Sequence, residues 1–387
     1  GRSLMRIVQA NAVYDPAFTT PDDLLDAYHS LTEWSVAMSE AGAQVSVVQR
    51  FRSNSTLVRD GITYQFVADR DAPWLSATAA PRPFVDAIAA RAADSVHVNG
   101  LIFPNLVSAI RTSVGPSPAI VVQHHGGEFP VRAPGWLGAW QRRQWRKGLE
   151  AASALSFTAQ TQAAAWHDAG VIGSQPILEI IEASTTLRPS PRDRAQQLTG
   201  VNADPLILWV GRLTTNKDPL AVLEGFERAL TTLPRAQLVM IFGDDTLREA
   251  VEQRRASSPR LQSTVALIGR VEHHELAHYY GAADLFVSGS HYEGSGYALI
   301  EAMAAGVTPV MTDIPSFRVI AGTSAHYWPV GDPAALEHAL VAAARGDREQ
   351  QRAATLRQFD TQVSWKAIAA RTMTAYQALL RTRTATP

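Results

Sequence analysis

The sequence lacks cysteine, any excess of charge of one sign and any long apolar run. Its 387 residues include no cysteine, which excludes disulfides, thiolate metal sites and a cysteine nucleophile. Lysine and arginine number 35 against 36 aspartates and glutamates, so no net basic field would attract nucleic acid. No stretch approaches the roughly eighteen consecutive apolar residues that a membrane-spanning helix needs.

These absences favour a cytoplasmic protein. The lack of cysteine suits a reducing compartment, and Met5 leads into an apolar strand without a secretory signal. The four residues before Met5 resemble a remnant of expression. The length allows two α/β domains, each with its own core.

Apolar strand-like runs alternate with helical patterns along the whole chain. This alternation predicts parallel sheets with right-handed crossovers, and its two blocks predict two Rossmann-like α/β domains with a cleft between them. A segment rich in Thr, Pro, Ser and Arg, 185–198, marks the boundary, which we place after residue 186. One long amphipathic helix is expected over 21–41. The predicted strands are 7–9, 45–48, 62–67, 96–98, 119–122, 155–157, 177–181, 206–210, 238–242, 265–268, 285–287 and 308–311.

The most informative segment runs from residue 291 to residue 309. Glu293 and Glu301 lie eight positions apart, with the turn Gly294-Ser295-Gly296 after the first and a predicted helix from Tyr297 around the second. The turn and the helix N-terminus offer N–H groups and a positive dipole end, which suit phosphate oxygens. A carboxylate at each end of such a turn can accept hydrogen bonds from sugar hydroxyls. The segment therefore predicts a nucleotide-sugar site.

A basic pair follows the predicted strand 206–210. Arg212 and Lys217 lie five positions apart, in the loop where Rossmann-like sheets present ligands. A guanidinium and an ammonium there can neutralise a diphosphate, which is the leaving group of sugar transfer. The spacing alone equally allows both residues to cap a helix or to form surface ion pairs.

These motifs resemble those of a known family. The run EGSGYALIEAMAAGVTPV, residues 293–310, resembles the E-x7-E signature of family 4 of the retaining GT-B glycosyltransferases. VGRLTTNK, residues 210–217, and the strand and helix over 265–280 are similar to the family's other segments. The resemblance covers about residues 205 to 335. It implies the GT-B fold, in which two Rossmann-like domains with parallel sheets face a central cleft.

The resemblance also implies a division of labour between domains. Residues 1–186 would form the acceptor domain, and residues 187–364 the nucleotide-sugar donor domain. The last helix, within 365–387, would cross back onto the acceptor domain.

The family assigns roles to matching positions of this chain. By resemblance, Glu293 contacts hydroxyls of the donor sugar and Glu301 accepts from the ribose hydroxyls. Arg212 and Lys217 would bind the diphosphate, and the base would lie against the backbone of 269–271. The full set of substrate-binding candidates is Gly211, Gly243, Arg270, Val271, Gly294, Ser295, Gly296, Tyr297, Glu301 and His124.

Two histidines end the predicted strand 119–122 of the first half. His124 and His125, followed by two glycines, resemble the family's V-x-x-H-G segment, with His125 aligning better. His125 is our candidate to contact the transferred sugar or the acceptor, and the alternative is a loop histidine bonded to a backbone carbonyl. Glu128, in the same loop, is a further candidate for an acceptor hydroxyl.

Three positions depart from the family pattern. The first loop, Asn11 to Pro16, replaces the usual pair of glycines, which leaves the acceptor class open. Asp218 stands where glycine is usual after the basic pair, and of the common Gly-x-Gly after residue 242 only Gly243 is present.

We expect neither a metal nor a cofactor. Asp69-Arg70-Asp71 matches a D-x-D pattern, but so short a match in a polar segment favours a solvated loop. Arg212 and Lys217 would replace a metal electrostatically.

A basic segment carries three tryptophans. Trp136, Trp140 and Trp145 interleave with arginines and a lysine between residues 142 and 147. Such a helix can lie on a membrane surface, or it can pack its tryptophans inward and solvate its cations. We favour inward packing here over peripheral membrane contact.

Taken together, the sequence predicts a retaining, metal-independent glycosyltransferase that moves a hexose from a nucleotide-diphosphate sugar to a hydroxyl of a sugar, lipid or small-molecule acceptor. UDP is expected as the nucleotide because it is the commonest in the family. The alternatives are a non-catalytic nucleotide-sugar binding relative and a GT-B sugar-nucleotide epimerase.

Overall fold

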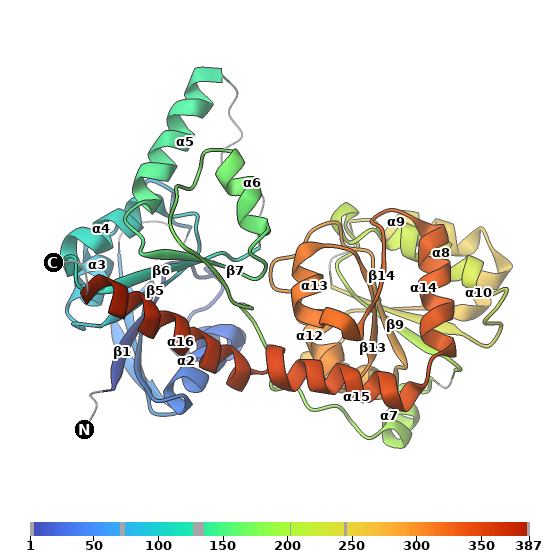
Figure 1. Ribbon diagram of the computed structural model, residues 1–387. Helices are drawn as coiled ribbons and strands as arrows, with labels where there is room; N and C mark the ends of the chain where they lie inside the picture. The colour runs from blue at the N-terminus through green and yellow to red at the C-terminus, as the bar shows by residue number, and fades with distance from the viewer. Residues whose placement is uncertain (1–3, 70–73, 127–134, 202, 244–245, 385–387) are drawn as a thin grey trace. The chain divides into compact units, whose positions relative to one another are not determined.

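The computed structural model describes residues 4–69, 74–126, 135–201, 203–243 and 246–384, and it divides into two compact units. Unit 1 consists of residues 1–183 together with 365–387, and unit 2 of residues 184–364 (Figure 1). The division follows residue 183, where the sequence suggested residue 186, and the last helix belongs to unit 1.

Unit 1 is built on an eight-stranded sheet in the order β3-β4-β2-β1-β5-β6-β7-β8. Every pair is parallel except β3 with β4, an antiparallel hairpin whose two turn residues, Asp60 and Gly61, have φ of 53° and 74°. Asp-Gly is the usual choice for such a turn, yet β3 is not among the strands predicted from the sequence. The strands are β1 (Met5–Asn11), β2 (Ala43–Phe51), β3 (Ser55–Arg59), β4 (Ile62–Ala68), β5 (Ser95–Asn99), β6 (Ala119–Gln123), β7 (Ala154–Phe157) and β8 (Ile177–Glu179).

Helices cover this sheet, and its core is formed by apolar strand residues such as Val96 and Val122, both fully buried. The helix expected over 21–41 is two helices, interrupted at Tyr28, whose ψ of 60° is not helical. The helices of unit 1 are α1 (Pro21–Ala27), α2 (His29–Glu40), α3 (Arg82–Ala89), α4 (Pro104–Val114), α5 (Gly135–Leu149), α6 (Gln162–Asp168) and α16 (Trp365–Thr384).

The C-terminal helix α16 is integral to unit 1. Trp365 Nε1 donates to Glu33 Oε2 on α2 at 2.6 Å, and the Tyr376 hydroxyl lies 2.5 Å from His97 Nδ1 on β5. Because Tyr376 and His97 are both buried, this bond fixes α16 against the centre of the sheet.

Unit 2 has a parallel six-stranded sheet in the order β11-β10-β9-β12-β13-β14. Its strands occur in the order 3-2-1-4-5-6 of the doubly wound dinucleotide-binding fold. The chain reverses direction across the sheet between β9 and β12, and ligands of such folds bind at the carboxyl ends of these strands. The strands are β9 (Leu206–Gly211), β10 (Gln237–Phe242), β11 (Val265–Gly269), β12 (Leu285–Ser288), β13 (Thr308–Thr312) and β14 (His326–Trp328).

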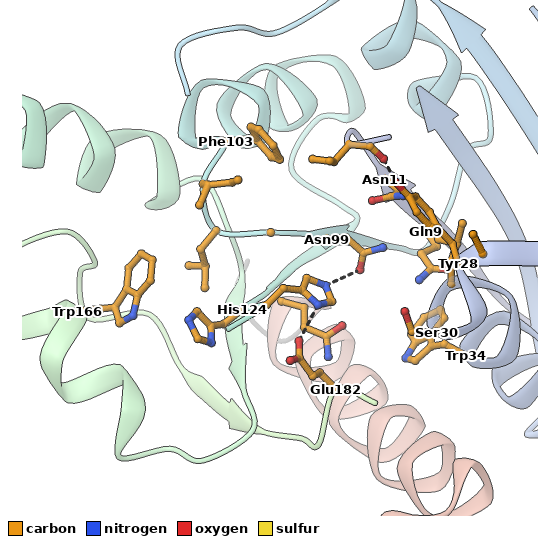
Figure 2. A pocket seen from close by; sticks show the side chains of 18 residues that line it. Gln9, Asn11, Tyr28, Ser30, Trp34, Asn99, Phe103, His124, Trp166 and Glu182 are labelled. Atoms are coloured by element: carbon orange, nitrogen blue, oxygen red, sulfur yellow. Dashed lines mark hydrogen bonds and ion pairs between the residues drawn. The ribbon is translucent and has the colours of Figure 1, made fainter. Parts of the chain in front are cut away.

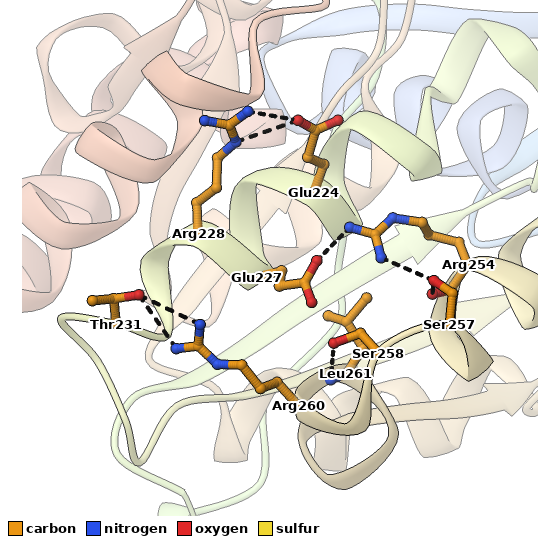
Figure 3. A network of polar contacts seen from close by, with 9 residues as sticks. All are labelled: Glu224, Glu227, Arg228, Thr231, Arg254, Ser257, Ser258, Arg260 and Leu261. Carbon is orange, nitrogen blue, oxygen red and sulfur yellow. Dashed lines mark hydrogen bonds and ion pairs between the residues drawn. The ribbon is translucent and has the colours of Figure 1, made fainter.

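Ion pairs and hydrogen bonds connect three helices of unit 2 at its surface (Figure 3). Glu227 on α8 pairs with Arg254 on α9, and Arg260 on α10 donates to Thr231 Oγ1. The helices of unit 2 are α7 (Arg192–Thr199), α8 (Pro219–Ala229), α9 (Arg248–Ala256), α10 (Pro259–Thr264), α11 (His273–Ala282), α12 (Tyr297–Ala304), α13 (Pro315–Ala321), α14 (Pro333–Arg345) and α15 (Arg348–Gln358), with short turns η1 (Thr215–Lys217), η2 (Gly322–Ser324) and η3 (Phe359–Val363).

Among the helices that the structure describes, none combines the length and the apolar character needed to cross a bilayer.

Candidate functional site

The basic pair of unit 2 lies at the reversal point of its sheet. Arg212 follows β9 and is exposed, and Lys217 closes the short turn η1 before α8. Asp218 then adopts a left-handed conformation with φ of 43°, and its side chain caps α8 by accepting from Ala221 N at 3.2 Å. Aspartate tolerates this conformation better than most residues, which explains how it replaces the glycine usual in the family.

Glu293 meets Lys217 at this point. Lys217 Nζ forms an ion pair with Glu293 Oε1, and the Ser290 hydroxyl donates to the same oxygen at 2.9 Å. The contact spans 76 positions of sequence and forms because β9 and β12 are neighbours in the sheet. Asn216 connects the loop after β9 to the loop after β12, since its side chain both donates to Tyr292 O and accepts from Tyr292 N.

The charge of Lys217 responds to its surroundings. Burial, and then the positive charge of Arg212, lower the pKa of Lys217 to about 8. The carboxylate of Glu293 acts in the opposite direction, because an adjacent negative charge favours the ammonium. A bound diphosphate, like Glu293, would raise the pKa of Lys217. An anionic ligand would therefore stabilise the charged form of this lysine.

The glycine turn leads into the N-terminus of α12. Gly296 is the N-cap residue with φ of 67°, and it provides no capping side chain. The positive φ favours glycine at this position, and a Cβ there would crowd Ile320 Cδ1 at 3.0 Å. Gly294 is buried, Ser295 half-buried and Tyr297 exposed. The helix dipole therefore points its positive end to the side of the sheet that carries Lys217.

Glu301 lies within α12 and is 8% exposed. Its Oε1 lies 2.8 Å from His273 Nε2, and its Oε2 accepts from the Tyr280 hydroxyl at 3.0 Å. Burial and Glu301 raise the pKa of Tyr280 well above its ordinary value, so Tyr280 remains a donor. Sequence reasoning did not identify His273 or Tyr280 as partners of Glu301, because neither belongs to the motif.

The segment expected to meet the base connects β11 to α11. Gly269 is buried with φ of 81°, whereas Arg270 is exposed and Val271 half-buried. A Cβ on Gly243 would lie 3.7 Å from Arg270 Nε, so the ends of β10 and β11 bring these two candidates together. Gly211 ends β9 beside them.

In unit 1, His125 contacts a carboxylate rather than a backbone carbonyl. Its Nδ1 lies 2.6 Å from Glu182 Oε2, and its Nε2 lies 3.2 Å from Asn99 Oδ1. Burial acts to lower the pKa of His125, but the charge and hydrogen bond of Glu182 outweigh burial and raise it. The side chain of Glu182 is 1% exposed, so its charge is held at the histidine. Sequence reasoning missed both Glu182 and Asn99.

His124 has a different environment from its neighbour. It is buried, stacks on Phe157 with ring centroids 4.7 Å apart, and meets Trp166 edge-on at 5.4 Å. Both histidines nevertheless line the same cavity of unit 1.

That cavity has a volume of about 380 Å³, within the range of small-molecule pockets. It lies at the carboxyl ends of the neighbouring strands β1 and β5, between which the order of strand addition in unit 1 changes direction (Figure 2). Its walls combine apolar and polar side chains. The apolar side chains include Leu31, Trp34, Phe103 and Trp166, and the polar ones Gln9, Asn11, Asn99, Gln123, His124, His125 and Glu182.

Buried hydrogen bonds support the floor of the cavity. Asn11 donates to Gln49 Oε1 at 2.6 Å, and Gln123 Oε1 lies 2.8 Å from His97 Nε2. Burial, and then the positive charge of His125, lower the pKa of His97 to about 3, so His97 is neutral. Asn11, expected in the first loop, is instead the last residue of β1, and its side chain takes part in building this cavity.

Several residues named from the sequence fall outside the part of the chain that the structure describes. They are Glu128, Arg70 and Asp71. Asp69, the first residue of the D-x-D match, forms an ion pair with the buried Arg50.

Residues 192–354 match the family model described as glycosyl transferases group 1. This match covers most of unit 2 and identifies that segment as a glycosyl transferase group 1 domain. A GDP-mannose:cellobiosyl-diphosphopolyprenol alpha-mannosyltransferase of Xanthomonas campestris is 27% identical over 302 residues, covering 76% of each chain. A phosphatidyl-myo-inositol mannosyltransferase of Mycobacterium leprae is 29% identical over 193 residues, 47% of this chain and 49% of the relative. The protein is therefore a glycosyltransferase.

Solved structures share the fold of this glycosyltransferase. Sucrose-phosphate synthase from Thermosynechococcus elongatus aligns with a TM-score of 0.66 and 19% identity over 98% of this chain and all of that one. A glycosyltransferase from Rickettsia africae aligns with a TM-score of 0.69 and 15% identity, over 98% and 99% of the two chains. The fold is GT-B, which confirms the predicted class of two Rossmann-like domains with mainly parallel sheets.

Proposed function

We propose that this glycosyltransferase moves mannose from GDP-mannose to a hydroxyl of a lipid-linked acceptor, with retention of anomeric configuration and without a metal. The observation that carries the proposal is the contact of Lys217 with Glu293 beside Arg212, at the reversal point of the unit 2 sheet.

Arg212 and Lys217 are proposed to bind the diphosphate. Two cations at the carboxyl end of β9 can neutralise the charge that develops on the leaving group, and their contacts strengthen as the glycosidic bond breaks. The N-terminus of α12 adds a third favourable interaction. This arrangement supports catalysis without a divalent ion, since fixed positive charge already exists at the leaving group.

Glu293 and Glu301 are proposed to hold the two sugars of the donor. Glu293 is oriented by Lys217 and Ser290 and would accept from a hydroxyl of the transferred hexose. Glu301 would accept hydrogen bonds from the ribose hydroxyls. To admit them, His273, the more exposed of its two partners, would have to share Glu301 with the ribose or move away.

GDP is proposed as the nucleotide in place of the UDP that its frequency in the family suggested. Both mannosyltransferases of Xanthomonas that resemble this chain are named for GDP-mannose. The exposed Arg270 and the backbone of β11 offer groups for a purine base at the expected position.

The unit 1 cavity is proposed as the acceptor site. The names of the relatives specify lipid-linked acceptors, a diphosphopolyprenol and a phosphatidyl-inositol. His125, whose pKa is raised by Glu182, would donate to an acceptor or donor oxygen. The apolar wall of Trp34, Phe103 and Trp166 suits a sugar ring face or an alkyl segment.

The reaction is proposed to proceed on one face of the sugar. The acceptor oxygen forms the new glycosidic bond, the bond to the diphosphate breaks on the same side, and the departing phosphate oxygen takes the acceptor proton. This route needs no protein nucleophile. The roles proposed for the candidate residues are accordingly limited to binding, charge stabilisation and hydrogen bonding.

Thermal shift with GDP-mannose, UDP-glucose, ADP-glucose and dTDP-glucose tests the donor, because a ligand that binds only the folded protein raises its melting temperature. We expect the largest shift with GDP-mannose and its loss in Glu301→Ala. An equal or larger shift with UDP-glucose would overturn the choice of GDP.

Turnover separates transfer from the alternatives. Incubation with GDP-mannose and a polyprenol-diphosphate disaccharide should release GDP and form an α-mannoside, readable from the anomeric coupling in NMR. Binding without product would indicate a non-catalytic relative. Interconversion of the sugar nucleotide without an acceptor would indicate an epimerase.

A further inference from the structure

Helix α5 presents two tryptophans to solvent. Trp136 is 82% exposed and Trp140 is 56% exposed, whereas Trp145 on the same helix is buried. The expectation that all three pack inward is therefore wrong for the first two. In Figure 1 the N-terminal part of α5 extends beyond the other described elements of unit 1, in agreement with the exposure of Trp136 and Trp140.

The exposed tryptophans share a face with basic residues. Trp136, Trp140, Arg143 and Lys147 follow one another at spacings of four, three and four, and at 3.6 residues per turn they occupy an arc of about 60°. The opposite face carries Trp145 and Leu149, which pack into the core of unit 1. The helix therefore has one face for the protein and a second, aromatic and basic, for another surface.

The charge of this outer face is strongly positive. A shallow groove beside it is lined by Arg142, Arg143, Arg146 and Lys147, with Glu150 as its acidic member. Arg146 pairs with Glu150 at 3.1 Å, and the other three cations have no ion-pair partner among the described residues. Since the formal net charge of the whole chain is −1, this is a local concentration of charge.

We propose that the outer face of α5 docks unit 1 onto an anionic lipid bilayer. Tryptophan is favoured at the boundary between headgroups and acyl chains, where its ring is buried and its N–H remains wet. Arginine and lysine on the same face interact with lipid phosphates. A nucleic-acid duplex would use the cations but would leave the two tryptophans in the N-terminal part of the helix unused.

Vesicle binding tests this without any substrate, so its outcome is independent of the proposed transfer reaction. The full chain is sedimented with vesicles of phosphatidylcholine alone and of equimolar phosphatidylcholine and phosphatidylglycerol. We expect binding to the anionic vesicles, a blue shift of tryptophan emission, and loss of binding at high salt.

Two double variants remove the two components separately. Arg143→Gln/Lys147→Gln should weaken partitioning by about thirtyfold, because each cation close to an anionic surface contributes about fivefold. Trp136→Ala/Trp140→Ala should weaken it by about tenfold or more and abolish the blue shift. Both variants change exposed helical positions to good helix formers, so the melting temperature should remain that of the parent protein.

Matched controls exist on unit 1. Trp74→Ala removes an exposed tryptophan that is not on α5, and Arg82→Gln/Lys366→Gln makes the same change in net charge outside that helix. Neither should alter vesicle binding by more than about twofold. Absence of binding to anionic vesicles, or equal losses in the α5 variants and the controls, would overturn the proposal. Dimerisation or RNA binding that depends on α5, without vesicle binding, would overturn it in favour of that partner.

Discussion

The two units place different chemistry at the same topological position. In unit 2 the reversal point between β9 and β12 carries Arg212, Lys217 and Glu293, and in unit 1 the reversal point between β1 and β5 carries a largely apolar cavity with one His125–Glu182 pair. The doubly wound topology determines where a ligand binds, because strand ends diverge there. The side chains on those ends differ, so under the proposed roles the unit 2 site would bind a diphosphate and the unit 1 site a less charged molecule.

The sharpest test of this contrast is removal of charge from unit 2. Lys217→Ala should lower kcat by about a thousandfold, since a fixed cation at a developing negative charge contributes about 3–4 kcal/mol to the barrier. Steady-state kinetics with GDP-mannose and acceptor measures it. Lys217→Arg is the matched control, and we expect it to retain more activity than the alanine variant. If the two variants were equally impaired, the charge would not be the property that matters.

The corresponding change in unit 1 should affect the acceptor alone. Glu182→Gln removes the carboxylate that raises the pKa of His125, so we expect kcat/KM for the acceptor to fall by about tenfold to a hundredfold near neutral pH. Because the protonated form is lost at lower pH in this variant, the alkaline limb of the pH profile should move to lower pH. The Kd for GDP should not change. A matching loss of GDP affinity would contradict the assignment of the donor to unit 2 and the acceptor to unit 1.

The pH dependence of nucleotide binding sharpens the assignment of Lys217. Its pKa in the free protein is about 8, so the ammonium is present below pH 8 and is lost as pH rises. The affinity for GDP should therefore fall by up to about tenfold per pH unit above this value. Isothermal titration from pH 7 to 9.5 measures it. Lys217→Arg should flatten the curve, and an unchanged slope would assign the titration to another group.

The smallest effect is expected at Glu301. Tyr280→Phe deletes one of the two donors to this buried carboxylate, which should lower the free energy of unfolding by about 1–2 kcal/mol. Urea unfolding measures it, with Tyr279→Phe on the same helix as the control. Nucleotide affinity should fall by less than the stability change, because ribose hydroxyls can replace the lost donor. A larger loss of affinity than of stability would place Tyr280 in direct contact with the nucleotide.

Local patterns predicted much of unit 2 correctly. Strands were expected at 206–210 and 238–242 and are β9 and β10, because short apolar runs between helical patterns leave few alternatives. The turn before α12 was also expected, since glycines between a strand and a helix are informative within a few residues. The helix over 21–41 was wrong because its amphipathic pattern continues through Tyr28, where the backbone leaves the helical region.

Other features depended on packing that no local pattern records. Helix α5 carries three tryptophans, Trp136, Trp140 and Trp145. Only the packing of α5 on unit 1 decides which of them is buried. Glu182 and Asn99 were missed because neither belongs to a motif. Each becomes a partner of His125 only when β5, β6 and the chain after β8 lie together.

The sequence by itself determined the α/β alternation, the resemblance of the second half to group 1 glycosyltransferases and the polar residues proposed to bind the donor at the strand ends. Tertiary structure alone decided which of those residues meet. Lys217 reaches Glu293 because β9 lies beside β12, and Glu301 acquires His273 and Tyr280 because these two side chains of α11 reach α12. The physical reason is that strand order follows from burying whole faces of helix and sheet, a cooperative property of the chain that no single segment contains.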